Sequence, residues 1–135
     1  MSIQRSPSSS RAKPVGGGFE LAVWYLMRLT GLGLFVLVLS HYLILHVLYD
    51  PAKQDASWIA TLRWSSTFWR AYDWLMLTLV LFHAFMGVRT VVADYTRGRV
   101  RGAVTVALYG LAAILFAMGT FVVLTLPAAH VVPAG

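Results

Sequence analysis

A histidine inside a very apolar stretch is followed, at fixed spacing, by residues that could bind a cofactor or move protons. The pattern consists of His83, Gly87, Arg89 and the pair Asp94-Tyr95. Ionisable side chains are costly in a bilayer, so a histidine at membrane depth is a functional-site hypothesis by default. The residues around it decide between a ligand, a proton carrier and a packing residue.

Helical geometry places most of this pattern on one face. At about 100° per residue, Gly87, Thr90 and Asp94 lie within about 40° of His83, and Asp94 lies about 16 Å from His83 along the axis. Arg89 lies off this face. It is expected to point toward another helix, or to extend to the inner headgroups.

A large flat cofactor would explain this face. Haem iron takes axial imidazole ligands, and a glycine one turn away leaves room for a porphyrin, while Arg28 or Arg89 could pair with a propionate. At the inner end, the Tyr95 phenol could donate to a quinone carbonyl and Asp94 could deliver a proton. The simpler alternatives are an interhelical hydrogen bond of His83, worth about 1 kcal/mol, and an ordinary helix end.

Three long apolar runs must position these residues. The chain has 135 residues, of which 59% are hydrophobic and only 12% charged, about half the charged fraction of a soluble domain. Each run reaches the ~20 residues that cross a bilayer core, and helices satisfy their backbone there. We therefore expect an all-α integral membrane protein with three transmembrane helices. Its parts are a flexible cytoplasmic arm (1–19), a membrane-anchor domain (20–126, helices at about 20–49, 68–95 and 103–126) and a short external tail (127–135).

Local signals refine these boundaries. Asp50-Pro51 should end the first helix, and Gly98 and Gly102 should mark the turn before the third. Tryptophans prefer the membrane–water boundary, and four of them mark the outer interface: Trp58, Trp64, Trp69 and Trp74. Small residues on the third helix predict its packing face, unless they only reflect the usual composition of spanning helices: Ala103, Ala107, Gly110, Ala113 and Ala117.

Charge and cysteine content restrict the partners. The net charge is +6, but the basic residues flank the apolar runs, where they set topology, so nucleic acid is not an expected partner. The positive-inside rule places the arm and the loop 95–102 in the cytoplasm and the C-terminus outside, as in the cytoplasmic (inner) membrane of a prokaryote. The chain has no cysteine, so any iron–sulfur cluster belongs to a partner.

The spacing of His83, Gly87, Asp94 and Tyr95 resembles that of the hydrophobic membrane-anchor (D) subunit of succinate dehydrogenase, respiratory complex II. Arg28-Leu29-Thr30-Gly31 is similar to the Arg-x-Thr segment of that family, and the Trp/Ser/Phe stretch 63–69 also fits. The resemblance covers about residues 20–126.

This resemblance implies half of a two-subunit haem-binding helical bundle. His83 would be an axial ligand of haem b, opposite a ligand from a sister cytochrome b anchor subunit. Tyr95 and Asp94 would lie at the ubiquinone or menaquinone site, and Arg28 would lie near the propionates or the quinone. The chain would be a non-flavin membrane subunit of the enzyme, which docks an iron–sulfur subunit and the flavoprotein that oxidises succinate.

Further histidines leave alternatives open. His41 and His46 face about 140° apart on the first helix. Either could hold a second, outer haem, or they could form interhelical or interfacial hydrogen bonds. His130 has no assigned role. Two other functions compete: a stand-alone di-histidine cytochrome b-type electron carrier, with His41 and His83 as ligands at compatible depths, and a haem-free membrane assembly protein.

Overall fold

The computed structural model describes residues 18–125, and the described chain forms three long helices joined by short segments. Helix α1 spans Phe19–Leu43 and continues as a π-helical segment, Ile44–Leu48. Helix α3 spans Thr67–Tyr95 and α4 spans Gly98–Thr125. The external tail and nearly all of the expected arm lie outside the described residues.

Each of the three helices is long and apolar enough to cross a membrane, as expected. The first ends where Tyr49 turns extended, and the Asp50 carboxylate accepts a hydrogen bond from the Ala52 N–H (3.0 Å). The third begins five residues earlier than expected, so Gly102 lies within α4 instead of the turn. Gly98 begins α4 with φ of 56°, a conformation in which a Cβ would be strained.

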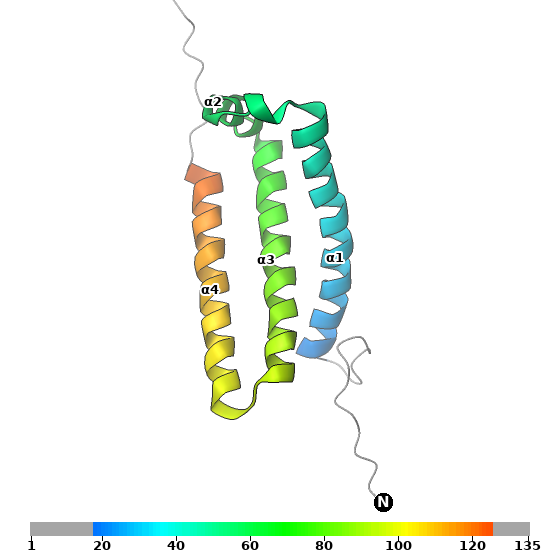
Figure 1. Cartoon of the computed structure of the whole chain (residues 1–135), viewed down its shortest axis with the longest axis vertical. Helices are drawn as coiled ribbons and strands as arrows, with labels where there is room; N and C mark the ends of the chain where they lie inside the picture. The colour runs from blue at the N-terminus through cyan, green and yellow to red at the C-terminus, as the bar shows by residue number, and fades with distance from the viewer. Residues whose placement is uncertain (1–17, 126–135) are drawn as a thin grey trace, which may run out of the picture.

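The helices form a single layer with α3 between α1 and α4 (Figure 1). Among residues 18–125, Val23 is the one buried hydrophobic side chain. Large apolar side chains such as Leu32, Phe35 and Phe121 are about two-thirds exposed (66%, 66% and 67%). A helix layer with so little internal burial needs lipid or another apolar surface against its faces.

The small-residue face expected on α4 does not meet α3 in the described chain. A Cβ on Gly110 would meet nothing within 4 Å, and the five residues of this face are all exposed: Ala103, Ala107, Gly110, Ala113 and Ala117. Helix α4 instead turns Gly119 toward α3, where an added Cβ would lie 2.5 Å from the Leu77 Cδ2. The alanine and glycine spacing does not reveal which side of α4 meets α3, because small residues occur on several faces.

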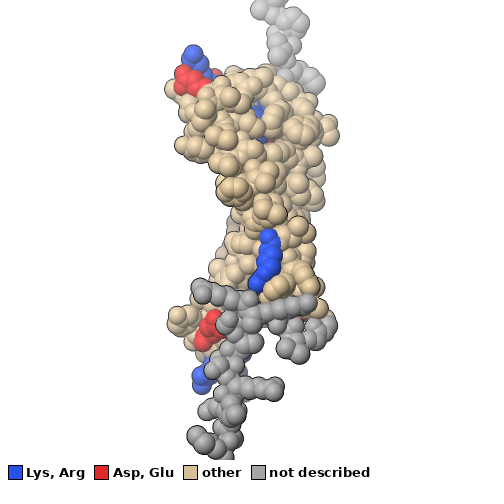
Figure 2. Space-filling model, turned by 90° about the vertical axis from the view of Figure 1, so that its right-hand side faces the viewer, with Lys and Arg blue, Asp and Glu red and all other residues tan. Residues whose placement is uncertain are grey.

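Short helical segments cover the end of the layer where α1 connects to α3 (Figure 1). We call this end the outer end, and the end where α3 joins α4 the inner end, after the orientation predicted from the sequence. They comprise Pro51–Lys53, α2 (Ala56–Trp58) and the π-helical segment Ile59–Arg63. The Asp55 carboxylate caps α2 by accepting hydrogen bonds from the Trp58 N–H (2.8 Å) and the Ser57 hydroxyl (2.7 Å). These bonds favour the ionised form, so the pKa of Asp55 is lowered. On the face drawn in Figure 2, charged side chains lie mostly toward the two ends.

Candidate functional site

His83 lies between α3 and α1, where Thr30 and Gly31 contact its ring. The His83 Nδ1 is 3.0 Å from the Thr30 Oγ1. A Cβ on Gly31 would lie 3.2 Å from the His83 Cε1. The ring edge that carries Nδ1 and Cε1 therefore faces α1, and Nε2 is the ring nitrogen that Thr30 does not engage.

Residues of the face expected from helical geometry lie toward α1 or line a groove beside it. Gly87 lies one turn from His83, and a Cβ there would be 3.9 Å from the Met27 Cε of α1. Gly87, Thr90 and Asp94 line a groove at the inner end of the layer. His83 contacts Thr30 and Gly31 of α1 and is not among the residues that line the groove. The structure therefore places the histidine between α1 and α3, and Gly87 and Asp94 in the adjoining groove.

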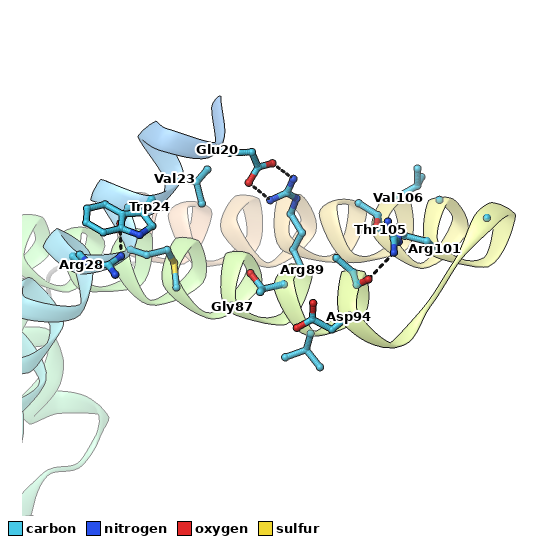
Figure 3. A pocket seen from close by; sticks show the side chains of 16 residues that line it. Glu20, Val23, Trp24, Arg28, Gly87, Arg89, Asp94, Arg101, Thr105 and Val106 are labelled. Atoms are coloured by element: carbon cyan, nitrogen blue, oxygen red, sulfur yellow. Dashed lines mark hydrogen bonds and ion pairs between the residues drawn. The ribbon is translucent and has the colours of Figure 1, made fainter. Parts of the chain in front are cut away.

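The inner groove has a volume of about 1090 Å³ and is open to the surroundings. Residues of α1, α3 and the first turns of α4 line it (Figure 3), including Glu20, Trp24, Arg28, Arg89, Arg101 and Thr105. The buried Trp24 Nε1–H lacks a hydrogen-bond partner in the described structure.

The two candidate arginines are held differently. The Arg89 Nη2 is 2.5 Å from the Glu20 Oε1, and the Arg89 Nη1 is 3.3 Å from the Glu20 Oε2 (Figure 3). The expectation that Arg89 points toward another helix is therefore confirmed. The Arg28 guanidinium stacks over the Trp24 ring at 3.4 Å and donates to the Trp24 carbonyl oxygen (3.1 Å).

Sequence reasoning did not single out Glu20 or Trp24. Their spacing contained a signal, because Glu20, Trp24 and Arg28 recur every four residues and so share one face of α1. The ion pair between Glu20 and Arg89 could not be predicted from the sequence, since it depends on the position of α1 relative to α3 along their axes.

Asp94 and Tyr95 end α3, and both are exposed. The Tyr95 side chain is 86% exposed and lies outside the residues that line the groove, whereas Asp94 is among them. Arg101 of α4 donates to the Ala93 carbonyl oxygen (2.6 Å) and the Thr96 carbonyl oxygen (2.9 Å), which fixes this helix end. The carboxylate and the phenol are thus presented at the inner rim.

His41 lies in a separate polar cluster near the outer end. The Arg63 side chain is 6% exposed, and its Nη2 is 2.5 Å from the Asp73 Oδ1, while the His41 Nδ1 is 3.8 Å from the same oxygen. The buried Arg63 Nη1 and His41 Nδ1 have no hydrogen-bond partner in residues 18–125. A pocket of about 170 Å³ adjoins this cluster. We call Arg63, Asp73 and His41 the outer cluster.

The depths of the histidines contradict one expectation. His83 is level with Thr30, and His41 is eleven residues further along α1, so the two lie about 16 Å apart along the layer. One iron cannot take both as axial ligands, and the di-histidine arrangement within a single chain is wrong. His46 is exposed beside the Tyr42 ring (4.9 Å between centroids). Within residues 18–125, no three metal-binding side chains cluster.

The fold and the site define a class of protein: a membrane protein of three spanning helices with a half-buried histidine, an open groove and many exposed apolar side chains in the described residues. The chain belongs to the succinate dehydrogenase/fumarate reductase transmembrane subunit family, whose model matches residues 3–126. It is similar to the succinate dehydrogenase hydrophobic membrane anchor subunit of Archaeoglobus fulgidus. The two are 32% identical over 87 residues, which cover 64% of this chain and 73% of that relative.

Proposed function

We propose that this chain is the hydrophobic membrane anchor of a succinate:quinone oxidoreductase, where it helps to bind haem b and forms part of the quinone-reduction site. The observation that carries the proposal is the His83 imidazole, half-buried in an apolar layer and bonded through Nδ1 to Thr30. Such a histidine has one nitrogen anchored and the other available as a metal ligand.

The residues around His83 fit a haem. His83 Nε2 would hold the iron on one side, and a sister cytochrome b anchor subunit would supply the opposite ligand. Bound haem supplies a one-electron redox centre. Gly87 adds no side chain on the same face one turn away, Arg28 offers a cation at the inner end, and the Trp24 N–H lacks an acceptor. Arg89 would act through its ion pair with Glu20, which holds the inner ends of α1 and α3 together.

The inner rim fits a quinone site that is completed by partners. Tyr95 donates a hydrogen bond to a quinone carbonyl and Asp94, directly or through water, delivers a proton. Tyr95 is 86% exposed in the isolated chain, so a partner surface must exclude water around it. The iron–sulfur subunit would dock at this rim. The flavoprotein, which oxidises succinate, would bind to the iron–sulfur subunit on the side away from the membrane. The quinone is ubiquinone or menaquinone.

Charge asymmetry supports an orientation with this rim in the cytoplasm. Arg97, Arg99 and Arg101 lie at the inner turn and the start of α4. At the outer end, the segment between α1 and α3 carries two basic residues, Lys53 and Arg63. By the positive-inside rule the arm is cytoplasmic and the tail external in the inner membrane of a prokaryote.

Haem binding is tested by purifying the complex through a tag on this chain. His83→Ala should abolish or strongly reduce the low-spin haem b spectrum, whereas the exposed His46→Ala should retain it. A complex that lacks haem in its wild-type form would instead favour a membrane assembly protein.

The quinone role is tested by two rates in the same preparation. Tyr95→Phe removes only the phenolic hydroxyl, so quinone reduction should fall while succinate oxidation by an artificial dye persists. Tyr49→Phe at the outer end is the matched control and should change neither rate. Equal loss of both activities in Tyr95→Phe would mean that the residue acts in assembly.

A second haem, held by His41 at the outer cluster, is a narrower proposal. His41 Nδ1 is buried without a hydrogen-bond partner in the described chain, which leaves this histidine available. Pyridine haemochrome analysis counts haems per complex. A value of one haem would refute this part and leave the role of His83 intact.

A further inference from the structure

The side chain of Thr30 is buried, 5% exposed, and it makes the hydrogen bond that orients His83. Its hydroxyl oxygen is 2.7 Å from the Leu26 carbonyl oxygen, 3.4 Å from the Met27 carbonyl oxygen and 3.0 Å from the His83 Nδ1. A hydroxyl has one proton to donate, and these three neighbours compete for it.

The number of available protons determines which partner donates in the hydrogen bond between Thr30 and His83. The Leu26 carbonyl oxygen can only accept, and it is the nearest neighbour of the Thr30 hydroxyl. If the Thr30 proton goes to Leu26, the Thr30 oxygen must accept from His83, so Nδ1 carries a proton. In a neutral imidazole the other nitrogen, Nε2, then carries the lone pair.

The chain of donors strengthens this arrangement. His83 N–H donates to the Thr30 hydroxyl, which donates to the Leu26 carbonyl, and successive hydrogen bonds polarise one another. Gly31 adds a steric constraint, because a Cβ there would lie 3.2 Å from the His83 Cε1. The missing side chain lets the imidazole edge approach the backbone of α1, where Thr30 can reach it.

We propose that Thr30 is a positioning residue, which holds His83 in the Nδ1–H tautomer and so presents the Nε2 lone pair for metal ligation. This inference rests on the proposed haem-binding role of His83. Hydrogen-bond acceptors behind a ligating histidine orient the ring and increase its basicity, and their loss typically lowers metal affinity about 10- to 100-fold.

The test compares Thr30→Val, which has the same shape without the hydroxyl, with Thr30→Ser, which keeps the hydroxyl. Thr78→Val is the matched control, because the Thr78 hydroxyl also donates to the carbonyl oxygen four residues earlier (2.9 Å) but makes no hydrogen bond to a histidine of the described chain. Each variant is purified as the intact complex. Haem content, the haem midpoint potential and the low-spin ferric EPR spectrum are then measured.

We expect Thr30→Val to lower haem affinity by about tenfold or more and to raise the midpoint potential, since a less basic imidazole stabilises the ferric state less. Thr30→Ser and Thr78→Val should match the wild type. A hydroxyl that merely joins two helices would not set the potential. If Thr30→Val prevents assembly, Thr30→Ala, which removes the hydroxyl without adding bulk, is measured in the same way.

The outcomes separate this inference from the proposed function. Haem that persists in His83→Ala refutes the ligand role itself. Haem that is lost in His83→Ala but has wild-type affinity and potential in Thr30→Val overturns the role of Thr30 alone. An equal shift in Thr30→Ser would also overturn it, because methyl packing would then be the cause.

Discussion

The ion pair between Arg63 and Asp73 should hold the outer segments onto the helix layer. Arg63 ends the segment Ile59–Arg63, and its guanidinium is 2.5 Å from the Asp73 carboxylate of α3 and 4.4 Å from the centre of the Trp69 ring. Asp73→Asn keeps the shape and removes the charge. The buried guanidinium would then lack its counter-charge.

The structure sets the size of this effect. Breaking a buried ion pair by removing one partner costs about 3–5 kcal/mol, because a charge is left uncompensated. Asp73 is 20% exposed, and the outer segment can release Arg63 into water, so we expect about 3 kcal/mol, the lower end of that range. The energy of the Arg63–Asp73 ion pair limits how often the segment Ile59–Arg63 detaches from α3. At 1.4 kcal/mol per factor of ten, its open population should rise about 100-fold.

Limited trypsin digestion of the purified complex measures this opening at Arg63. The Arg63 side chain is 6% exposed and Lys53 is 82% exposed. Cleavage after Arg63 therefore reports opening, and cleavage after Lys53 is an internal reference. Asp73→Asn should accelerate cleavage after Arg63 by about 100-fold, in the regime where cleavage tracks the open population, and leave cleavage after Lys53 unchanged.

Two controls make the result interpretable. Lys53→Met removes an exposed ion pair with Asp50, worth about 0–1 kcal/mol, and thermal unfolding of the complex should barely change. The double variant Arg63→Met with Asp73→Leu removes both charges and also the cleavage site, so it is compared with Asp73→Asn by thermal unfolding. It should recover most of the lost stability. The argument is refuted if Asp73→Asn leaves cleavage after Arg63 at the wild-type rate.

Two further predictions use glycines that pack against α3, Gly31 of α1 and Gly119 of α4. Gly110→Ala is the control for both, because a Cβ on Gly110 would meet nothing within 4 Å. Gly31→Ala should displace the imidazole of His83, because the added Cβ would lie 3.2 Å from its Cε1. The haem absorption spectrum should shift as a result. An unchanged spectrum would contradict the close contact. Gly119→Ala should force Leu77 from its position and destabilise the α3–α4 pair by about 1–3 kcal/mol. Thermal unfolding in detergent measures the difference from Gly110→Ala. Equal midpoints for the two variants would disprove this prediction.

Several features of this protein were predictable from the order of its residues. Three runs of about 20 or more apolar residues predict three spanning helices, because a bilayer leaves the backbone few other ways to satisfy its hydrogen bonds. The period of an α-helix places Gly87 and Asp94 on the His83 face. Asp50-Pro51 marked the end of the first helix, because proline cannot continue a helix and disfavours helical backbone at the residue before it. The orientation inferred from the basic residues stays a prediction.

Only the tertiary structure decided which residues meet across helices. The bond from His83 to Thr30, the ion pair from Arg89 to Glu20 and the burial of Arg63 all depend on the depth and rotation at which separate helices pack. The stripe of small residues on α4 points away from α3 for that reason, and His41 and His83 lie at different depths. Local periodicity determines the face of one helix, whereas the register between two helices follows from the combined packing of all their side chains.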